Sequence, residues 1–358
     1  YYVIASGSDT SFSLRFVNLL AVQFLGESEA LVSVFGTEHD DFLVLRPGTS
    51  PQVVINGVSY GLSEMPDSLT VQGGLGSGVD IVVAYDGPGD DVFHLRPGSL
   101  KAVIPGPIPV SVDQIVGFEE AHVYATGGGQ DTAYLYDSSE HGLVALSVSL
   151  KSEPQYRHVK MIGPGVYHRA KLVEVVHAFA TGDNDRAVFF DSPGDDVFFG
   201  GYGLSRMAGP GYDVTAHNFR TVTAFASQGY DRADLVDSIF KDEFHAKGHK
   251  HEIFDQVTAG ARYRITVRAF DHVYAEASTA GTSRDTLKVW PTGGDDLVAI
   301  SGDVLDHFAV SGEEMRWLFR AVGFEVAKLQ PTTDSSDQAQ LTEPIQMNLE
   351  IGSGWQVN

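Results

Sequence analysis

The sequence predicts an all-β fold, a right-handed parallel β-helix (solenoid) built from repeats of about fifty residues. Three observations support this prediction. A phrase recurs in which a strand ends at an aspartate, a tight corner follows, and an acidic pair opens the next strand. Apolar and polar residues alternate over short stretches rich in β-branched and aromatic side chains, as is typical of strands. Helical periodicity is scarce along the whole chain.

The repeat is clearest at Asp185–Phe199, which reads DRAVFFDSPGDDVFF. Near the start of the array, the dipeptide Asp40-Asp41 lies 50 residues before Asp90-Asp91. Self-similarity at a fixed period indicates stacked units, each of which buries its apolar face against its neighbours. Further copies lie at Leu31–Leu45, Asp80–Leu95, Asp131–Val144, Asp231–Phe244 and Asp285–Val298.

A β-propeller is the alternative fold, because its blades also repeat every forty to fifty residues or so. The connections read as corners between successive faces, without the hairpin turns of a meander, and this favours the β-helix. About fifty residues also fit two coils of three strands each. Small residues at alternating positions suit the interior of such a coil; they are Ala125, Ala178, Ala180, Ala224, Ala226, Ala275 and Ala277.

Both ends of the chain depart from the repeat. Residues 1–30 are predicted to form an N-terminal cap and residues 31–310 the repeats. Residues 311–330 are predicted to form a C-terminal cap with a helix at Glu313–Val326, followed by a polar linker over 331–344. Residues 345–358 read as a terminal strand that either folds back onto its own chain or adds to a neighbour's open edge. We expect exchange between subunits, because an intramolecular cap needs no long tether.

Composition excludes several classes of protein. The chain has 24 basic and 47 acidic residues and a formal charge of −23, which excludes nucleic acid as a partner because phosphate binding requires a basic face. It has no cysteine, and therefore no disulfide framework. No apolar run is long enough to predict a transmembrane segment. The opening Tyr1-Tyr2 is interpreted as the start of a processed form.

The phrase at Asp185–Phe198, with its partial copies at Asp80–Phe93 and Asp131–Ser138, resembles repeats in long secreted proteins of planctomycete bacteria. Its Gly-Asp-Asp-x-Phe end is also distantly similar to the calcium-binding nonapeptide repeats of secreted toxins and epimerases. The resemblance covers roughly residues 31–300 and implies an extracellular or cell-surface β-solenoid. In the nonapeptide proteins the acidic turn returns every nine residues or so, whereas here it returns once per fifty.

The acidic corners predict bound calcium. Carboxylates and outward-pointing carbonyl groups at a turn form the hard oxygen set that calcium prefers. The alternative is that aspartate favours corners because its side chain accepts hydrogen bonds from backbone amides. The predicted ligands are Asp90, Asp91, Asp195, Asp196, Asp295 and Asp296.

Most histidines and a local run of bases lie in the middle repeats. This pattern is consistent with a groove for an acidic polysaccharide, in which a base abstracts the proton beside a uronate carboxylate, as in a lyase. The alternative is solvated surface charge or salt bridges to neighbouring acids. His245, His249 and His251 form a weak zinc motif. The candidate catalytic residues are Tyr167, His168, Arg169, Lys171, His245 and Arg264.

Two classes of function follow from these patterns. The first is an extracellular or cell-surface structural protein that assembles with copies of itself into oligomers or filaments, with calcium-stabilised corners. The second is a polysaccharide lyase or related carbohydrate-active enzyme that acts on an acidic glycan. The first is preferred, because no motif fixes an acid, a base and a neutralising group at defined spacing.

Overall fold

The protein is all-β. A computed structural model describes residues 20–24, 29–34, 39–47, 52–61, 68–72, 78–105, 110–137, 145–149, 157–255, 261–278, 284–311, 314–333 and 336–358. Within these ranges there is no helix, and hence none that could cross a membrane. The prediction of an all-β chain is confirmed.

The described strands form two large sheets, called sheet A (18 strands) and sheet B (16 strands). Sheet A contains β1 (Leu20–Phe24), β2 (Glu29–Val34), β6 (Ser68–Gln72), β8 (Val92–Arg96), β9 (Ser99–Ile104), β10 (Val110–Val116), β12 (Thr132–Tyr136), β16 (Val175–Phe179), β18 (Val197–Gly201), β19 (Leu204–Gly209), β20 (Tyr212–His217), β22 (Arg232–Val236), β26 (His272–Glu276), β28 (Asp295–Gly302), β29 (Val304–Ser311), β30 (Glu314–Val322), β32 (Gln338–Ile345) and β34 (Gln356–Val357). Sheet B contains β3 (Phe42–Arg46), β4 (Gln52–Ile55), β5 (Val58–Gly61), β7 (Ile81–Tyr85), β11 (Glu120–Tyr124), β13 (Ala145–Ser149), β14 (His158–Gly163), β15 (Val166–Lys171), β17 (Arg186–Phe190), β21 (Thr221–Phe225), β23 (Asp242–Lys247), β24 (Lys250–Asp255), β25 (Arg264–Arg268), β27 (Thr286–Trp290), β31 (Val326–Leu329) and β33 (Asn348–Ile351).

Each fifty-residue repeat corresponds to five strands, and consecutive repeats exchange sheets. The repeat that begins at Asp80 places β7 in sheet B, the antiparallel strands β8, β9 and β10 in sheet A, and β11 in sheet B. The repeat that begins at Asp131 reverses this assignment, with β12 and β16 in sheet A and β13 to β15 in sheet B. Equivalent strands therefore return to the same sheet only after two repeats.

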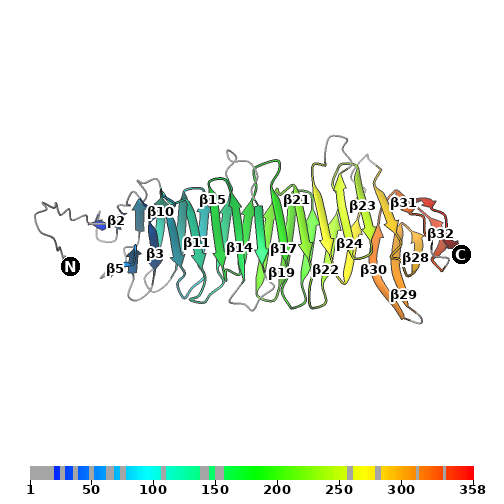
Figure 1. The fold of residues 1–358 in the computed structure, drawn as a ribbon, viewed down its shortest axis with the longest axis horizontal. Coiled ribbons are helices and arrows are strands. Elements are labelled where there is room, and N and C mark those ends of the chain that lie inside the picture. The colour runs from blue at the N-terminus through cyan, green and yellow to red at the C-terminus, as the bar shows by residue number, and fades with distance from the viewer. Residues whose placement is uncertain are drawn as a thin grey trace, which may run out of the picture.

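The strands are ordered linearly along the long axis of the molecule, with β2 and β5 towards one end and the C-terminus at the other (Figure 1). In sheet B the order is β5, β4, β3, β7, β11, β15, β14, β13, β17, β21, β25, β24, β23, β27, β31 and β33. The parallel pairs form both within and between repeats, since β11 pairs with β7 of its own repeat and with β15 of the next. Strands within a three-stranded group pair antiparallel. Most of the described pairings are parallel.

Tight turns join the antiparallel strands, and here the predicted absence of hairpins is wrong. The turns at Pro164-Gly165 and Pro210-Gly211 connect β14 to β15 and β19 to β20. Gly165 and Gly211 have φ values of 66° and 75°, a backbone region that glycine adopts without a steric cost. The sequence marked these turns correctly as tight, but the strands on either side of each turn pair with each other.

A continuous apolar core lies between the sheets. Alternate side chains of each strand point inwards, as the burial patterns of β12 and β16 show. Phe189 of sheet B and Phe198 of sheet A are fully buried and meet edge to face, with ring centroids 5.6 Å apart. The predicted interior alanines are all buried, but they project from both sheets instead of one face: Ala178 and Ala275 belong to sheet A and Ala224 to sheet B.

The predicted C-terminal helix is wrong. Residues 314–322 form β30, which pairs with β26 and β29, and residues 326–329 form β31. The predicted linker contains most of β32, which pairs with β28. The terminal strand divides into β33 and β34, which pair with β31 and β32 of the same chain. Of the predicted N-terminal cap, residues 1–19 and 25–28 lie outside the described residues.

Candidate metal centres at the acidic corners

The acidic corners are closed by a local hydrogen bond. In the corner after β17, the backbone N–H of Ser192 donates to Oδ2 of Asp196 over 2.9 Å. An aspartate four residues after the first corner position can satisfy an amide that has left the sheet ladder. The same bond recurs from Gly87 to Asp91 (2.9 Å), from Ser238 to Asp242 (2.7 Å) and from Thr292 to Asp296 (2.7 Å).

A second hydrogen bond ties each corner to the next coil. The backbone N–H of the corner aspartate donates to Oδ1 of the aspartate that leads a later repeat. The pairs are Asp41 to Asp80 (2.9 Å), Asp91 to Asp131 (2.8 Å), Asp196 to Asp231 (2.9 Å), Asp242 to Asp285 (2.7 Å) and Asp296 to Asp337 (2.9 Å). The leading aspartates thus form a regular ladder along both edges of the molecule.

In three of the described corners, the aspartate that follows the preceding strand also reaches the next coil. Asp191 accepts hydrogen bonds from the amide and the hydroxyl of Ser227, at 2.5 and 2.6 Å. Asp137 does the same with Thr181, and Asp86 with Thr126 and Gly127. Three carboxylates from two coils therefore converge at a corner.

Three such groups bring one carboxylate oxygen of each residue within 4.8 Å of the others, and every member is buried. We call them triad 1, triad 2 and triad 3. They consist of Asp86, Asp91 and Asp131; Asp191, Asp196 and Asp231; and Asp237, Asp242 and Asp285. Triads 1 and 2 lie where the chain passes from sheet B to sheet A, and triad 3 lies at the opposite edge.

Burial and mutual repulsion disfavour the charged carboxylates. Burial, and then the charges of Asp131 and Asp86, raise the pKa of Asp91 to about 7. Burial is also the main reason why the pKa of Asp231 and that of Asp285 are raised to about 7. A triad must therefore hold a proton or a cation near neutral pH to limit this repulsion.

Two members of the triads have buried oxygens without a good hydrogen-bond partner. Oδ1 of Asp91 has none, although Asp91 is fully buried. The equivalent oxygens of the other corners accept from a hydroxyl or an imidazole: Asp196 from Tyr212, Asp242 from Tyr263, and Asp296 from His307. Neither carboxylate oxygen of Asp237 accepts a hydrogen bond of ordinary geometry. Burial raises the pKa of Asp237, and the nearby amide of Ser278 partly offsets this increase. An unpaired buried carboxylate oxygen is costly, and a bound cation would satisfy it.

The donor set fits a hard divalent cation. Each triad could hold a metal ion through three carboxylate oxygens, with backbone carbonyls of the corner as further oxygen donors. No nitrogen or sulfur ligand belongs to any of the three groups, which disfavours zinc and other transition metals.

The structure separates the six predicted metal ligands into two sets. Asp91 and Asp196 belong to triads, whereas Asp90, Asp195 and Asp295 are exposed. The first two exposed residues accept amide hydrogen bonds from the next coil, from Gln130 and Tyr230, each at 2.8 Å. Asp296 is buried but pairs with His307, because Pro291 occupies the position of the aspartate that would complete a triad.

The sequence reading missed seven triad members: Asp86, Asp131, Asp191, Asp231, Asp237, Asp242 and Asp285. A signal for them was present, because an aspartate five residues before the corner aspartate and another at the head of the next repeat recur in each triad. The acidic dipeptide is more conspicuous, yet its first residue points to solvent.

The six candidate lyase residues do not converge. Tyr167, Arg169 and Lys171 share the outward face of β15, whereas His168 points into the core and is 1 % exposed. Burial lowers the pKa of His168 to about 4. His245 and Arg264 lie on the same sheet, but β15 and β25 are separated by β14, β13, β17 and β21, about 24 Å at ordinary strand spacing.

The three histidines of the weak zinc motif also lie apart. His251 is buried on the inner side of β24, His245 points outwards beside Glu243, and His249 is exposed in the turn. They form no cluster among the described residues.

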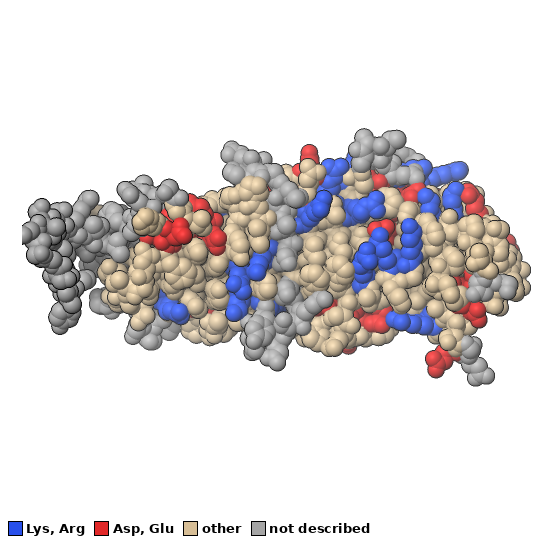
Figure 2. All heavy atoms as spheres, viewed as in Figure 1, with Lys and Arg blue, Asp and Glu red and all other residues tan. Residues whose placement is uncertain are grey.

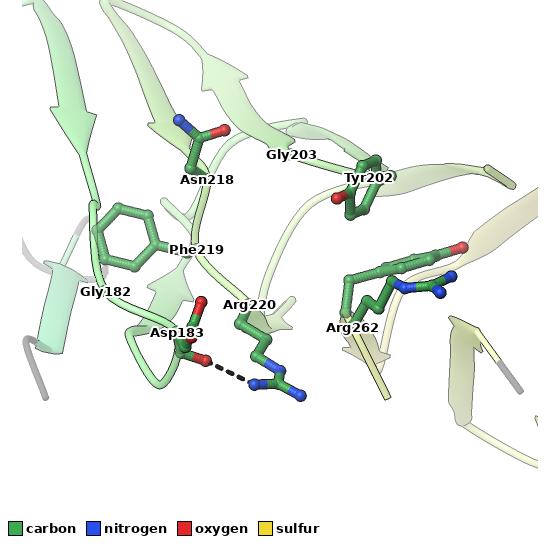
Figure 3. A pocket seen from close by; sticks show the side chains of 9 residues that line it. Gly182, Asp183, Tyr202, Gly203, Asn218, Phe219, Arg220 and Arg262 are labelled. Atoms are coloured by element: carbon green, nitrogen blue, oxygen red, sulfur yellow. Dashed lines mark hydrogen bonds between the residues drawn. The ribbon is translucent and has the colours of Figure 1, made fainter. Parts of the chain in front are cut away.

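A cleft of about 340 Å³ opens beside triad 3, lined by Tyr202, Asn218, Arg220, Arg262 and Tyr263 among others (Figure 3). Arg220 donates to the carbonyl of Asp183 over 3.0 Å, and Arg262 lies over the ring of Phe240 at 4.0 Å. The hydroxyl of Tyr263 donates to Oδ1 of Asp242 over 2.9 Å, so one wall of the cleft also positions a member of triad 3. None of the candidate lyase residues lines this cleft.

The chain was compared with protein-family models, with curated proteins and with solved structures, and none of them matches it. The similarity to planctomycete repeats therefore stays a prediction. The geometry of the corners and sheets is what bears on the function of the chain.

Proposed function

We propose that this chain is a structural repeat protein of the extracellular space or cell surface, a rigid β-solenoid stabilised by calcium at its acidic corners. The observation that carries the proposal is the ladder of aspartates, which joins five described corners to the next coil along both edges of the molecule. The linear order of strands favours a solenoid over a propeller, whose blades surround a central axis.

Calcium suits the triads better than magnesium does. Magnesium keeps several water ligands and requires near-octahedral geometry, whereas the triads are buried and offer three carboxylates at once. Calcium accepts six to eight or so oxygens in irregular arrangements. An extracellular location fits this ion, because calcium sites of extracellular modules have dissociation constants of about 0.1–1 mM.

Assembly of copies end to end follows from the sheet edges. Of the described strands, β33 and β5 terminate sheet B, and each has a pairing partner on one side only. Unpaired backbone groups at a sheet edge favour the addition of another strand. We therefore propose that an end of one copy pairs with an end of another.

The calcium proposal is tested by thermal unfolding with a chelator and with added calcium or magnesium. Calcium should raise the melting temperature and the chelator should lower it, because a ligand that binds only the folded state stabilises it. Asp91→Asn should reduce this response. Its neighbour Asp90→Asn is the matched control, since Asp90 is exposed and an asparagine keeps the oxygen that accepts from Gln130. The proposal fails if wild type and both variants respond alike, or if none responds.

Negative-stain electron microscopy and light scattering across a concentration series test the structural role. We expect rigid rods that lengthen by whole units as concentration rises. A strictly monomeric chain at all concentrations would contradict the assembly proposal, and a compact round particle would contradict the solenoid.

A further inference from the structure

Cations gather on one face of an otherwise acidic molecule. Lys160 of β14 and Arg169 and Lys171 of β15 point outwards from sheet B, and we call these three residues the basic patch. His122, Tyr124 and Tyr167 lie beside them on the same face. Figure 2 shows lysine and arginine side chains over the middle of the body and again towards its C-terminal end.

The charges within the patch oppose one another. Lys160 lies directly across from Arg169 in the antiparallel pair of β14 and β15, and like charges at such positions are destabilising. Burial, and then the charges of Arg169 and Lys160, lower the pKa of His122 to about 4. Among the described residues, the three patch cations form no ion pair with a carboxylate. The neighbouring carboxylate of Glu120 lies 3.3 Å from Nε2 of His122 instead.

On sheet A, by contrast, three arginines form ion pairs with aspartates. Arg206 binds Asp213, Arg232 binds Asp234, and Arg320 binds Asp306, each through two nitrogen–oxygen contacts. The chain has nearly twice as many acidic as basic residues, so acidic partners for its surface cations are plentiful. Cations of sheet B outside the patch are paired as well, Lys250 with Glu252 and Lys288 with Glu243. The lack of an acidic partner is therefore a property of the basic patch and points to an external anion.

We propose that the basic patch binds an anionic polysaccharide. Lys160, Arg169 and Lys171 hold its carboxylate or sulfate groups, and the adjacent tyrosines contact its hydroxyl groups. A second group of cations on the same face, Lys247 and Arg268, lies towards the C-terminal end of sheet B. A long polymer laid along the sheet would contact both groups, which raises its apparent affinity above that of a single sugar. This proposal does not depend on calcium or on assembly.

A polysaccharide fits the face better than a nucleic acid does. The formal charge of −23 repels any polyanion, so net charge alone does not distinguish the two ligands. Single-stranded nucleic acid also needs open aromatic faces on which bases stack. One side of Tyr124 is stacked on Tyr85, at 5.4 Å between centroids, while Arg169 and Lys171 lie over its ring.

The test measures binding of the full chain to immobilised polygalacturonate, dextran sulfate, neutral dextran and single- and double-stranded DNA. We expect binding to one or both anionic polysaccharides and a loss of affinity as salt rises. The variant K160Q/R169Q/K171Q should bind at least about tenfold more weakly, because it loses three hydrogen-bonded contacts between a cation and an anionic group. The control R206Q/R232Q/R320Q removes three charges from sheet A and should bind within about twofold of wild type.

Preference for polygalacturonate or for dextran sulfate identifies the anionic group. The inference is overturned if neither polysaccharide binds, if the patch variant binds as wild type does, or if DNA binds more tightly than both polysaccharides. Acetylation of the unmodified chain provides a readout that no folding defect of a variant can affect. The anionic polysaccharide that binds should protect Lys160 and Lys171 but leave the exposed Lys101 of sheet A reactive, and equal reactivity of all three would also overturn the inference.

Discussion

At the residue scale, each aspartate of a corner has its own structural position. The first member of an acidic pair is exposed and holds one amide, whereas the second is buried and holds the turn. Two neighbouring and chemically identical side chains therefore differ in burial and in the charge they can sustain. This difference follows from the alternation of side chains at the start of a strand.

The glycines that precede the leading aspartates allow the corners to stack closely. A Cβ atom at Gly229 would lie 2.2 Å from the carbonyl oxygen of Gly194, and Gly229 has a φ of 114°. Gly229→Ala should therefore lower the free energy of unfolding by more than the 1–2 kcal/mol or so of backbone strain alone. Gly293→Ala is the matched control, because Gly293 has a φ of 92° but nothing within 4 Å. Urea unfolding measures both, and equal losses would show that corner contact contributes nothing.

Buried histidine makes the fold sensitive to acid. The pKa of His168 is about 4 in the folded protein, below the value of about 6.5 expected after unfolding. The unfolded chain therefore binds more protons between these values, so stability is full above about pH 6.5 and falls as the pH drops towards 4. Replacing His168 with Leu should remove on the order of 2 kcal/mol of the stability difference between pH 7 and pH 5. The exposed His249→Gln is the control in the same urea titrations, and identical pH dependence of the two variants would contradict the assignment.

At the element scale, the fifty-residue repeat is a unit of five strands that changes sheets at every step. Hydrogen bonds from one unit to the next are parallel, and those within a three-stranded group are antiparallel. The first and last strands of a unit also pair in parallel, as β7 does with β11 and β12 with β16. The remaining edges of such a pair are occupied by strands of the neighbouring units, as β3 pairs with β7 and β15 with β11. Each unit thus depends on its neighbours, as in other repeat proteins.

The C-terminal strands complete the sheets of their own chain. β33 pairs with β31, and Trp355 donates to the carbonyl of Gln330 over 2.8 Å. Deleting residues 344–358 should lower the melting temperature and increase association, because it exposes the edges of β31 and β32. Deleting only 356–358 keeps β33 and Trp355 and should have a smaller effect. Unchanged melting and a soluble monomer after the longer deletion would instead support exchange of this segment between subunits.

At the scale of the whole molecule, the strands stack along one axis (Figure 1). Sheets of 16 and 18 strands at about 4.8 Å spacing give a length of about 70–80 Å. A compact protein of this size would have a radius of gyration of about 21 Å. Small-angle X-ray scattering at low concentration should give a value above about 24 Å, as expected for a rod of this length. A value near 21 Å would contradict the extended stack.

The sequence by itself determined the β class, the repeat and the tight turns. These are local properties: apolar alternation, Pro-Gly pairs and aspartates at fixed spacing each act within a few residues. It also singled out Asp91 and Asp196, which belong to the triads, because the acidic corner is visible as a motif. The basic run that includes Tyr167, Arg169 and Lys171 was likewise identified from sequence, and these side chains do share one face.

Only the tertiary structure decided which aspartates meet. Asp86 and Asp131 are 45 positions apart, and they converge because the chain crosses to the other sheet and returns one coil later. The same crossing moves equivalent alanines to opposite sheets and turns the Glu313–Val326 segment into strands, since pairing with β26 and β29 overrides a weak helical pattern. Leading aspartates continue to Asp337, inside the predicted linker, because the ladder requires only one carboxylate at the right place. The local sequence pattern thus specifies the strands and corners, whereas stacking between residues about forty positions apart selects which strands and aspartates pair.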